Sequence, residues 1–154
     1  MAEPMVIDSS VAAKWFLEDE SDTDLAENLL LAILAGDIEG YIPRVALYEV
    51  CHLLTKACLR PSKTQPGYRI TTDRAARCIR EFLDLPLQKP DVTDHECLAA
   101  FEMATKYSKG HADMAFLWRA MQLDCQWCTA DEKVLEACGP GFPIQHVLLL
   151  SVTR

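Results

Sequence analysis

The sequence predicts an α/β fold in which helices flank a small, mainly parallel sheet. Short apolar segments alternate with longer segments of helical periodicity, a pattern typical of strands joined by helical crossovers. The 154 residues have the size of one domain, and 50% of them are hydrophobic, which allows a substantial core. No internal repeat or linker divides the chain, so we expect a single domain over residues 1–154.

The first part of the chain is predicted to alternate strands and helices. An apolar run ends in the carboxylate of Asp8, and Ser9 or Ser10 can cap the helix that follows. A leucine-rich stripe of helical spacing then stops at Gly36, a residue suited to a helix C-terminus. The expected elements are strands at 5–8 and 40–43 and helices at 11–16, 22–36 and 45–59.

The segment Arg60–Arg69 interrupts this alternation. Prolines, a glycine and little apolar content predict a loop there, one that is mobile or faces a partner. Beyond it we expect helices at 71–83, 93–106 and 112–123, with Gly110 ending the second of them. We also expect strands at 85–87, 126–129 and 145–150, and a short helix that opens at Asp131.

Composition limits the classes of function. No apolar run approaches the roughly 18 residues that span a bilayer, and the N-terminus lacks a signal-peptide pattern, so we expect a cytoplasmic protein without a membrane partner. The seven cysteines sit mostly in helical apolar contexts, where thiols pack as small hydrophobes. Cys125 and Cys128 have the spacing of a redox or zinc motif, but no second pair completes it, and buried thiols are the interpretation we favour.

The net charge of −8 makes nucleic acid a poor partner by global electrostatics. Nucleic-acid chemistry would then need local basic patches and a bound cation. Arg74, Arg77 and Arg80 recur every three residues on nearly one face of a predicted helix. Such a row is typical of a solvated face, and it can also contact phosphates or an acidic partner.

Acidic residues border apolar segments at four places: Asp8, Glu49, Asp113 and Asp131. A carboxylate among apolar neighbours is costly unless its charge is compensated. Asp8 and Asp131 follow predicted strands, so they would share one crevice at the carboxyl edge of the sheet if those strands are neighbours. Glu49 lies on the inward stripe of its helix, and Asp113 opens a helix that is apolar nearly all round.

Each acid also has a purely structural interpretation. Asp8 and Asp131 can cap helices, the helix dipole can stabilise Asp113, and Glu49 can form a buried ion pair with Arg44 or Lys14. Together, however, clustered carboxylates repel one another unless a cation holds them. Hard oxygen ligands with few histidines suit Mg²⁺ or Mn²⁺, and such a metal can activate water against a phosphodiester.

The chain resembles the PIN-domain ribonucleases and, among them, the VapC-type toxins of toxin–antitoxin pairs. The segment Val6–Val11 is similar to the family's first-strand acid with its following serine or threonine. Residues 41–43 leading into 48–50 resemble the second motif, Asp113 resembles the third acid, and Cys128–Asp131 resembles the Thr-x-Asp motif with the fourth acid. The resemblance covers nearly the whole chain, although the loop at 60–69 looks longer than in compact toxins.

The resemblance implies a three-layer, PIN-like sandwich and metal-dependent endonucleolytic cleavage of RNA. It implies Mg²⁺ or Mn²⁺ as cofactor, a homodimer, and an antitoxin whose segment enters the active-site groove. The implied metal ligands are Asp8, Glu49, Asp113 and Asp131, with supporting hydrogen bonds from Ser10 and Thr129.

The basic residues suggested for RNA contact are Lys14, Arg44, Arg74 and Arg77, and Trp15, Phe16 and the leucine-rich helix could supply the dimer surface. Two other classes of function stay open beside cleavage. A PIN-like fold could bind RNA or protein without cutting. A phosphorylatable receiver-like domain fits poorly, because the strand at 145–150 supplies no lysine.

Overall fold

The computed structural model describes residues 1–153, so Arg154 of the expected domain lies outside the described residues. Its four strands form one sheet in the order β2-β1-β3-β4, and every pairing in it is parallel. The strands are β1 (Glu3–Ile7), β2 (Ile38–Tyr41), β3 (Gln126–Thr129) and β4 (Val147–Leu149). The predicted α/β class with a small parallel sheet is therefore confirmed.

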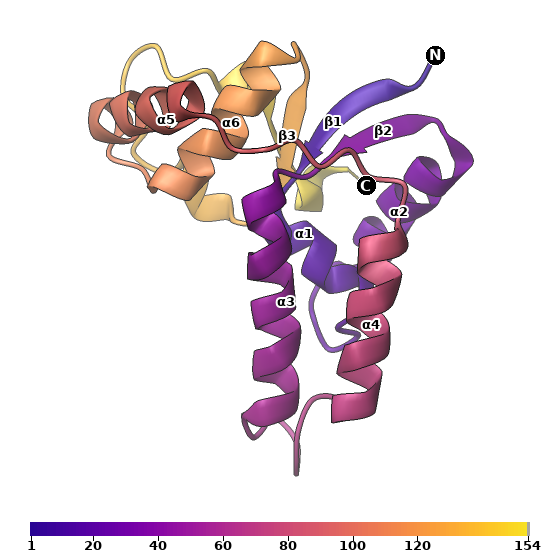
Figure 1. Cartoon of the computed structure of the whole chain (residues 1–154). Coiled ribbons are helices and arrows are strands. Elements are labelled where there is room, and N and C mark those ends of the chain that lie inside the picture. The colour runs from indigo at the N-terminus through magenta and orange to yellow at the C-terminus, as the bar shows by residue number, and fades with distance from the viewer. Residues whose placement is uncertain (154) are drawn as a thin grey trace.

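Six α-helices surround the sheet (Figure 1). They are α1 (Ser9–Ala12), α2 (Thr23–Ala35), α3 (Arg44–Leu59), α4 (Thr72–Asp84), α5 (Asp94–Tyr107) and α6 (His111–Gln122). Helices α3 and α4 lie side by side and project from the sheet as an arm. Helices α5 and α6 pack against each other, and α6 also packs against β3. Among residues 1–153, no helix is long and apolar enough to cross a membrane.

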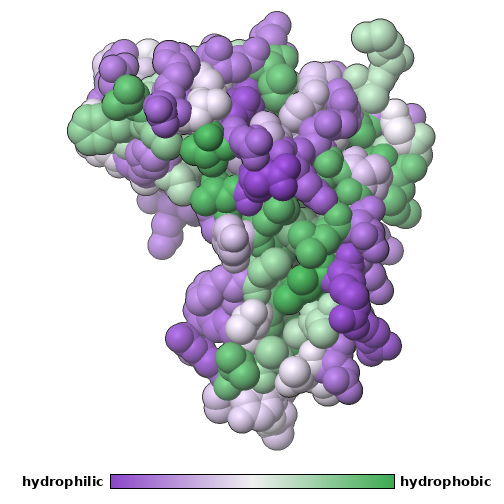
Figure 2. All heavy atoms as spheres, in the orientation of Figure 1, coloured by the Kyte–Doolittle hydropathy of each residue, from purple (hydrophilic) through white to green (hydrophobic). Residues whose placement is uncertain are grey.

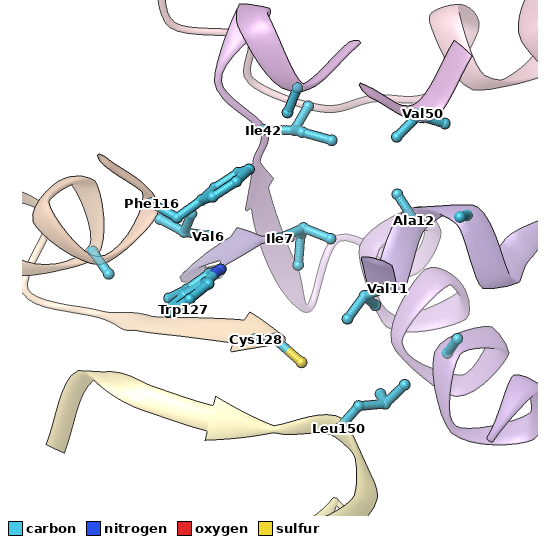
Figure 3. Close-up of a cluster of buried hydrophobic side chains, with 14 of the residues drawn as sticks. Val6, Ile7, Val11, Ala12, Ile42, Val50, Phe116, Trp127, Cys128 and Leu150 are labelled. Atoms are coloured by element: carbon cyan, nitrogen blue, oxygen red, sulfur yellow. The ribbon is translucent and has the colours of Figure 1, made fainter. Parts of the chain in front are cut away.

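The core forms where β1 and β3 meet α1, α3 and α6. Val6 and Ile7 of β1 are fully buried, and so is Trp127 of β3. Figure 3 shows these side chains near Ile42, which lies between β2 and α3, and near Phe116 of α6. The buried face of each element thus points to one cluster, which fixes the ends of β1 and β3 relative to α3 and α6.

Local capping explains the helix boundaries. Thr71 accepts a hydrogen bond from the Arg74 backbone N at 3.1 Å, and Thr93 accepts one from the Glu96 backbone N at 3.1 Å. Each threonine thereby satisfies an amide that the first helical turn leaves free. Gly36 ends α2 at φ 81°, a left-handed conformation that glycine adopts without strain.

Several details differ from the sequence expectations. The strand expected at 40–43 is β2 at Ile38–Tyr41, two residues earlier. Residues 85–87 form no strand; Gln88 alone bridges to β2, because Pro86 has no amide to extend the ladder. The first helix is a short α1 followed by a 3-10 turn, and its cap is Asp8 rather than Ser9 or Ser10. Helix α5 ends before Ser108 at φ 53°, ahead of Gly110, and β4 is three residues flanked by 3-10 turns.

The predicted loop at 60–69 is a loop in the structure, and its end is held by ion pairs. Ser62 N donates to the Gly67 carbonyl at 2.7 Å, which closes the loop on itself. Arg69 donates two hydrogen bonds to Asp19, at 2.7 and 2.6 Å, and a third to Glu20 at 2.9 Å. The loop is therefore anchored to the segment that follows α1.

All seven cysteines are free thiols. Cys78, Cys125 and Cys128 are buried, as expected for thiols that pack as small hydrophobes. Cys97 is exposed, so the expectation of burial is wrong there: its position on α5 faces solvent beside a cavity next to α6. Burial raises the pKa of the Cys128 thiol to about 12, which keeps it protonated and unreactive.

Candidate active site

The sheet topology brings two of the predicted acids to the same edge. Strands β1 and β3 are parallel neighbours, with Val6 opposite Trp127 and Ile7 opposite Cys128. Asp8 directly follows β1, and its backbone N donates to the Cys128 carbonyl at 3.0 Å. Asp131 follows β3 by two residues, so both carboxylates lie beyond the carboxyl ends of adjacent strands, where open α/β sheets bind ligands.

Asp8 is a buried carboxylate with a partner on each oxygen. Its Oδ2 accepts hydrogen bonds from the Ser10 backbone N, at 3.0 Å, and from the Ser10 hydroxyl. Its Oδ1 accepts a bond from the Trp127 indole Nε1 at 3.2 Å. Burial raises the pKa of Asp8, and the bonds from Ser10 and Trp127 oppose that rise because they favour the charged form.

The Ser10 hydroxyl links the two strand ends. Its oxygen accepts a hydrogen bond from the Ala130 backbone N at 3.1 Å while the hydroxyl donates to Asp8. The Thr129 hydroxyl plays a similar part on β3 and accepts from the Asp131 backbone N at 3.2 Å. Both residues suggested to support the acids therefore make hydrogen bonds beside them.

Glu49 projects from α3 and is half-buried. Its Oε2 accepts a hydrogen bond of 2.7 Å from the Ser9 hydroxyl, which connects α3 to the end of β1. The two bases considered for an ion pair with Glu49 bind other carboxylates: Arg44 pairs with Asp91, and Lys14 pairs with a residue after α1. The geometry therefore gives Glu49 a serine partner in place of the suggested buried ion pair.

Asp113 lies in the first turn of α6, behind the Gly110 cap. Burial raises the pKa of Asp113 from 3.8 to about 6, and repulsion from Asp8, Asp131 and Glu49 adds to that rise. A nearby lysine, Lys109, acts in the opposite direction. The other three acids therefore act electrostatically on Asp113. The dipole of α6 by itself would lower the pKa of Asp113, so burial and repulsion prevail over it.

Asp131 is the exposed member of the set. Its Oδ1 accepts a hydrogen bond from the Lys133 backbone N at 3.0 Å and so caps the 3-10 turn Glu132–Leu135. The cap expected from the sequence is present, and it leaves the second carboxylate oxygen, Oδ2, free of that bond. Capping and a place in the acidic group are compatible for this residue.

The acids are near neighbours rather than an assembled metal site. Within residues 1–153, no three side chains of His, Cys, Asp or Glu are grouped closely enough to hold a metal ion. Their mutual effect on the pKa of Asp113 is still expected, because Coulombic repulsion extends well beyond the ligand distance of about 2 Å. An oxygen-only donor set with mutual repulsion fits a hard divalent cation, which would reduce that repulsion.

The basic residues suggested for RNA contact do not gather around the acids. Lys14 is buried, and its Nζ donates to the Ser21 carbonyl at 2.8 Å and lies 3.6 Å from Glu20 Oε2. The expectation of a free phosphate contact at Lys14 is therefore wrong, because the segment after α1 folds back over it. The other three are exposed: Arg44, which pairs with Asp91, Arg74, which pairs with Glu18, and Arg77.

Sequence reasoning missed three residues at the site. Ser9 and Trp127 donate to Glu49 and Asp8, and Lys109 Nζ donates to the backbone carbonyls of Lys133 and Glu136. The Ser9 hydroxyl adjoins the first acid and could have been suspected from the Asp-Ser-Ser run. The Trp127 and Lys109 contacts depend on strand register and loop packing, for which the sequence carries no local signal.

A cavity of about 200 Å³ opens beside Glu49. Its walls come from α3, α5, α6 and the segments before α3 and α5, and they are mostly apolar. The lining residues include Pro43, Val45, Val92, Cys97, Ala112 and Phe116. An exposed histidine, His111, sits at this cavity with its Nε2 3.0 Å from the Cys97 carbonyl.

The family model described as the PIN domain matches residues 5–139. The chain belongs to the PIN-domain family. The match includes all four acids, the part of β1 from Met5 to Ile7 and the whole of β3. A comparison with curated proteins finds no match.

Solved structures share this PIN fold at low sequence identity. A toxin–antitoxin complex from Klebsiella pneumoniae aligns with a TM-score of 0.62 at 12% identity, over 95% of this chain and 97% of that chain. VapBC2 from Rickettsia felis, bound to a promoter DNA fragment, aligns with a TM-score of 0.63 at 14% identity, over 95% and 98%. VapC20 from Mycobacterium tuberculosis, a sarcin–ricin loop cleaving toxin, aligns at 0.58 and 17% identity, over 79% and 85%.

Proposed function

We propose that this PIN-domain protein is a metal-dependent endoribonuclease and the toxin of a toxin–antitoxin pair, folded as one domain over residues 1–154. One observation carries the proposal: three carboxylates from separate elements, those of Asp8, Glu49 and Asp131, lie close enough to Asp113 to add to the rise in its pKa that burial causes. Clustered like charges destabilise a fold, so their collection at the ligand-binding edge of the sheet favours a functional role. The family match and the toxin folds among its neighbours support the same proposal.

The cofactor we propose is Mg²⁺ or Mn²⁺. Asp8, Glu49 and Asp113 would hold it directly, and Asp131 would hold a second ion or order a water molecule. When bound, the ion supplies an activated water and positive charge that stabilises the phosphodiester transition state. The donors are all oxygens, which matches the preference of these hard cations.

The chain's own residues prepare the site for this ion. Ser10 and Trp127 bind opposite oxygens of Asp8, and Ser9 binds one oxygen of Glu49, so neither carboxylate can rotate freely. Each hydrogen bond leaves further lone pairs on the same carboxylate for a ligand. Orientation by such partners typically strengthens metal binding.

The RNA surface we propose lies along α4 rather than around the acids. Arg74 and Arg77 are exposed there, and Figure 2 shows hydrophilic side chains along one edge of the arm formed by α3 and α4. Arg44, the first residue of α3, lies five positions before Glu49 on the same helix. Lys14 is excluded from the surface by its burial.

An antitoxin is the protein partner we propose. Two structural neighbours are complexes of a toxin with its antitoxin, and this chain offers an apolar cavity beside Glu49. An apolar side chain of a partner placed in that cavity would lie next to Glu49. Occupation of the cavity would then interfere with access to Glu49.

A homodimer is also proposed. Of the surface that the sequence suggested, the leucine-rich helix α2 remains available, because Leu31 and Leu34 are exposed. Phe16 is buried, and Trp15 is half-buried with its Nε1 bonded to the Ala26 carbonyl at 2.8 Å, so these two residues are unsuited to an interface. Figure 2 shows an apolar stretch between α3 and α4. Tyr48 and Leu59 of α3 are exposed and could pack against a second copy.

The alternative is a PIN fold that binds RNA or protein without cutting. The test is incubation of the purified protein with total RNA and defined tRNAs in Mg²⁺ or Mn²⁺, with a chelator control. Asp8→Asn is the inactive variant, and Asp84→Asn, an exposed acid at the end of α4, is the matched control. Cleavage that requires metal and is lost only in Asp8→Asn supports the nuclease; binding without cleavage by every folded form supports the alternative.

A further inference from the structure

We infer that Trp127 is a positioning residue that holds the carboxylate of Asp8 in the orientation that binds the divalent cation. The inference rests on the proposed function, because it concerns the same metal. It assigns a specific task to a residue of β3 that contacts no substrate. That task is to donate the indole N–H to one oxygen of Asp8.

The hydrogen bond is enclosed by the fold. Trp127 has no exposed surface, Asp8 is 6% exposed, and the Trp127 Nε1 lies 3.2 Å from Asp8 Oδ1. The other oxygen, Oδ2, receives the Ser10 backbone N at 3.0 Å. Donors from the protein therefore reach both oxygens, and each oxygen keeps acceptor capacity for a ligand.

The indole itself is held in a fixed position. Trp127 pairs with Val6 in the β1–β3 register, and its ring stacks on Phe116 of α6 with centroids 5.9 Å apart and planes 2° from parallel. Figure 3 shows Trp127 beside Phe116 and Val6, with its ring nitrogen at the edge of the cluster. Since Asp113 lies one helical turn before Phe116, the same stack connects the elements that carry Asp8 and Asp113.

A purely structural role for Trp127 makes a different prediction. A buried indole generally needs an acceptor for its N–H, and any carbonyl of the core would serve. Trp15 illustrates this case, because its Nε1 donates to the Ala26 carbonyl at 2.8 Å. Trp15 is thus a matched control: it makes the same kind of bond without contact to an acid.

The test measures Mn²⁺ affinity rather than cleavage, by the loss of the free Mn²⁺ signal in electron paramagnetic resonance. Wild type, Trp127→Phe and Trp15→Phe are compared with Asp8→Asn as the ligand-deficient reference. We expect Trp127→Phe to bind Mn²⁺ about tenfold more weakly, the lower end of the effect of removing a ligand's hydrogen-bond partner. Trp15→Phe is expected to bind as wild type does.

A second replacement separates the hydrogen bond from packing. β-(3-Benzothienyl)alanine installed at position 127 keeps the shape of the indole but replaces its N–H with sulfur. The same tenfold loss with this residue supports the inference even if Trp127→Phe fails to fold. Wild-type affinity in the benzothienyl protein overturns it, whereas absence of Mn²⁺ binding in wild type overturns the proposed metal site itself.

Discussion

The hydroxyl of Ser9 donates a hydrogen bond of 2.7 Å to Oε2 of Glu49, a residue 40 positions further along the chain. It joins the segment after β1 to the first turns of α3, and Ser9 is itself buried. Asp8, the preceding residue, is held separately by Ser10 and Trp127. Two consecutive residues therefore serve two of the four acids, since Asp8 is one of them and Ser9 orients Glu49.

Ser9→Ala should weaken the proposed ribonuclease about tenfold, because Glu49 loses the partner that fixes its side chain. The free energy of unfolding should fall by only about 1 kcal/mol, the usual contribution of one hydrogen bond. Initial cleavage rates and urea unfolding measure the two effects. Ser62→Ala, in the loop at 60–69, is the control, and an unchanged rate in Ser9→Ala would show that Glu49 needs no such support.

Metal-free stability should fall as pH rises through about 6, because the pKa of Asp113 is raised from 3.8 to about 6 in the folded chain. The folded state then binds a proton that the unfolded state has already lost, so the stabilisation is complete below pH 3.8 and is lost above the folded pKa. Asp113→Asn removes this dependence. Partial exposure screens the effect, and we expect the variant to gain about 1 kcal/mol over wild type at pH 7.

Urea unfolding at pH 5 and pH 7, in the presence of a chelator, measures that difference. Asp84→Asn serves as a control for the general removal of an acid. A stability gap between Asp113→Asn and wild type that stays constant from pH 5 to pH 7 would contradict the prediction.

Mn²⁺ or Mg²⁺ should stabilise the folded chain, because a cation that binds only the native state shifts the unfolding equilibrium. At a metal concentration of 100 times Kd the gain is about 2.7 kcal/mol, visible as a rise in Tm. Calorimetry with and without chelator measures it. The rise should disappear in Asp8→Asn, and an equal rise in that variant would place the ion elsewhere.

The buried ion pair between α5 and α6 should be essential to stability. Arg119 Nη2 lies 3.2 Å from Glu96 Oε2, and Glu96 is 1% exposed. Glu96→Ala leaves the guanidinium buried without its carboxylate, so we expect a loss of about 3–5 kcal/mol. The double variant Glu96→Leu/Arg119→Met should recover most of it, and the exposed Glu102→Ala on the same helix should cost little.

Urea unfolding of these four proteins tests the pair. A loss below about 1 kcal/mol in Glu96→Ala would mean that water or a rearranged side chain compensates Arg119. If the double variant does not regain the lost free energy of unfolding, the loss in Glu96→Ala comes from side-chain packing rather than from the unpaired charge.

Arg69→Ala should loosen the loop at 60–69 with little effect on global stability. Its guanidinium donates to Asp19 and Glu20, and the pairs are partly exposed, so their contribution is about 1 kcal/mol or less. Cleavage after Lys63 by endoproteinase Lys-C should become faster, since the loop is released from its anchor. Arg80→Ala is the control. Equal cleavage rates in the two variants would show that hydrogen bonds within the loop, rather than Arg69, keep it ordered.

Local signals predicted most of the fold. Helix α4 begins one residue after its expected start, because Thr71 caps the helix instead of belonging to it, and β3 has the expected bounds. The strand expected at 85–87 is absent. Its apolar residues favoured a strand, but Pro86 has no amide to donate to a neighbouring strand. Lys14 was misjudged since its burial depends on how the segment after α1 folds back.

The acids themselves were predictable because costly carboxylates beside apolar segments are visible in a sequence. Their roles as ligands stay a prediction. The contacts that orient them were not predictable, because Trp127 reaches Asp8 only in one register of a parallel strand pair. Because β1 and β3 are far apart in the sequence, their register depends on how the whole core packs rather than on neighbouring residues.

The central pairing of β1 with β3 also has a consequence for biosynthesis. Asp8 and Trp127 are separated by 119 positions, and Asp8 reaches the other strand end through residues 128–130. Loop closure over such a distance is slow, and domains form from the N-terminus as the ribosome advances. A nascent chain that has not yet reached β3 therefore cannot assemble this acidic edge, so the proposed active site would form only after most of the chain has been translated.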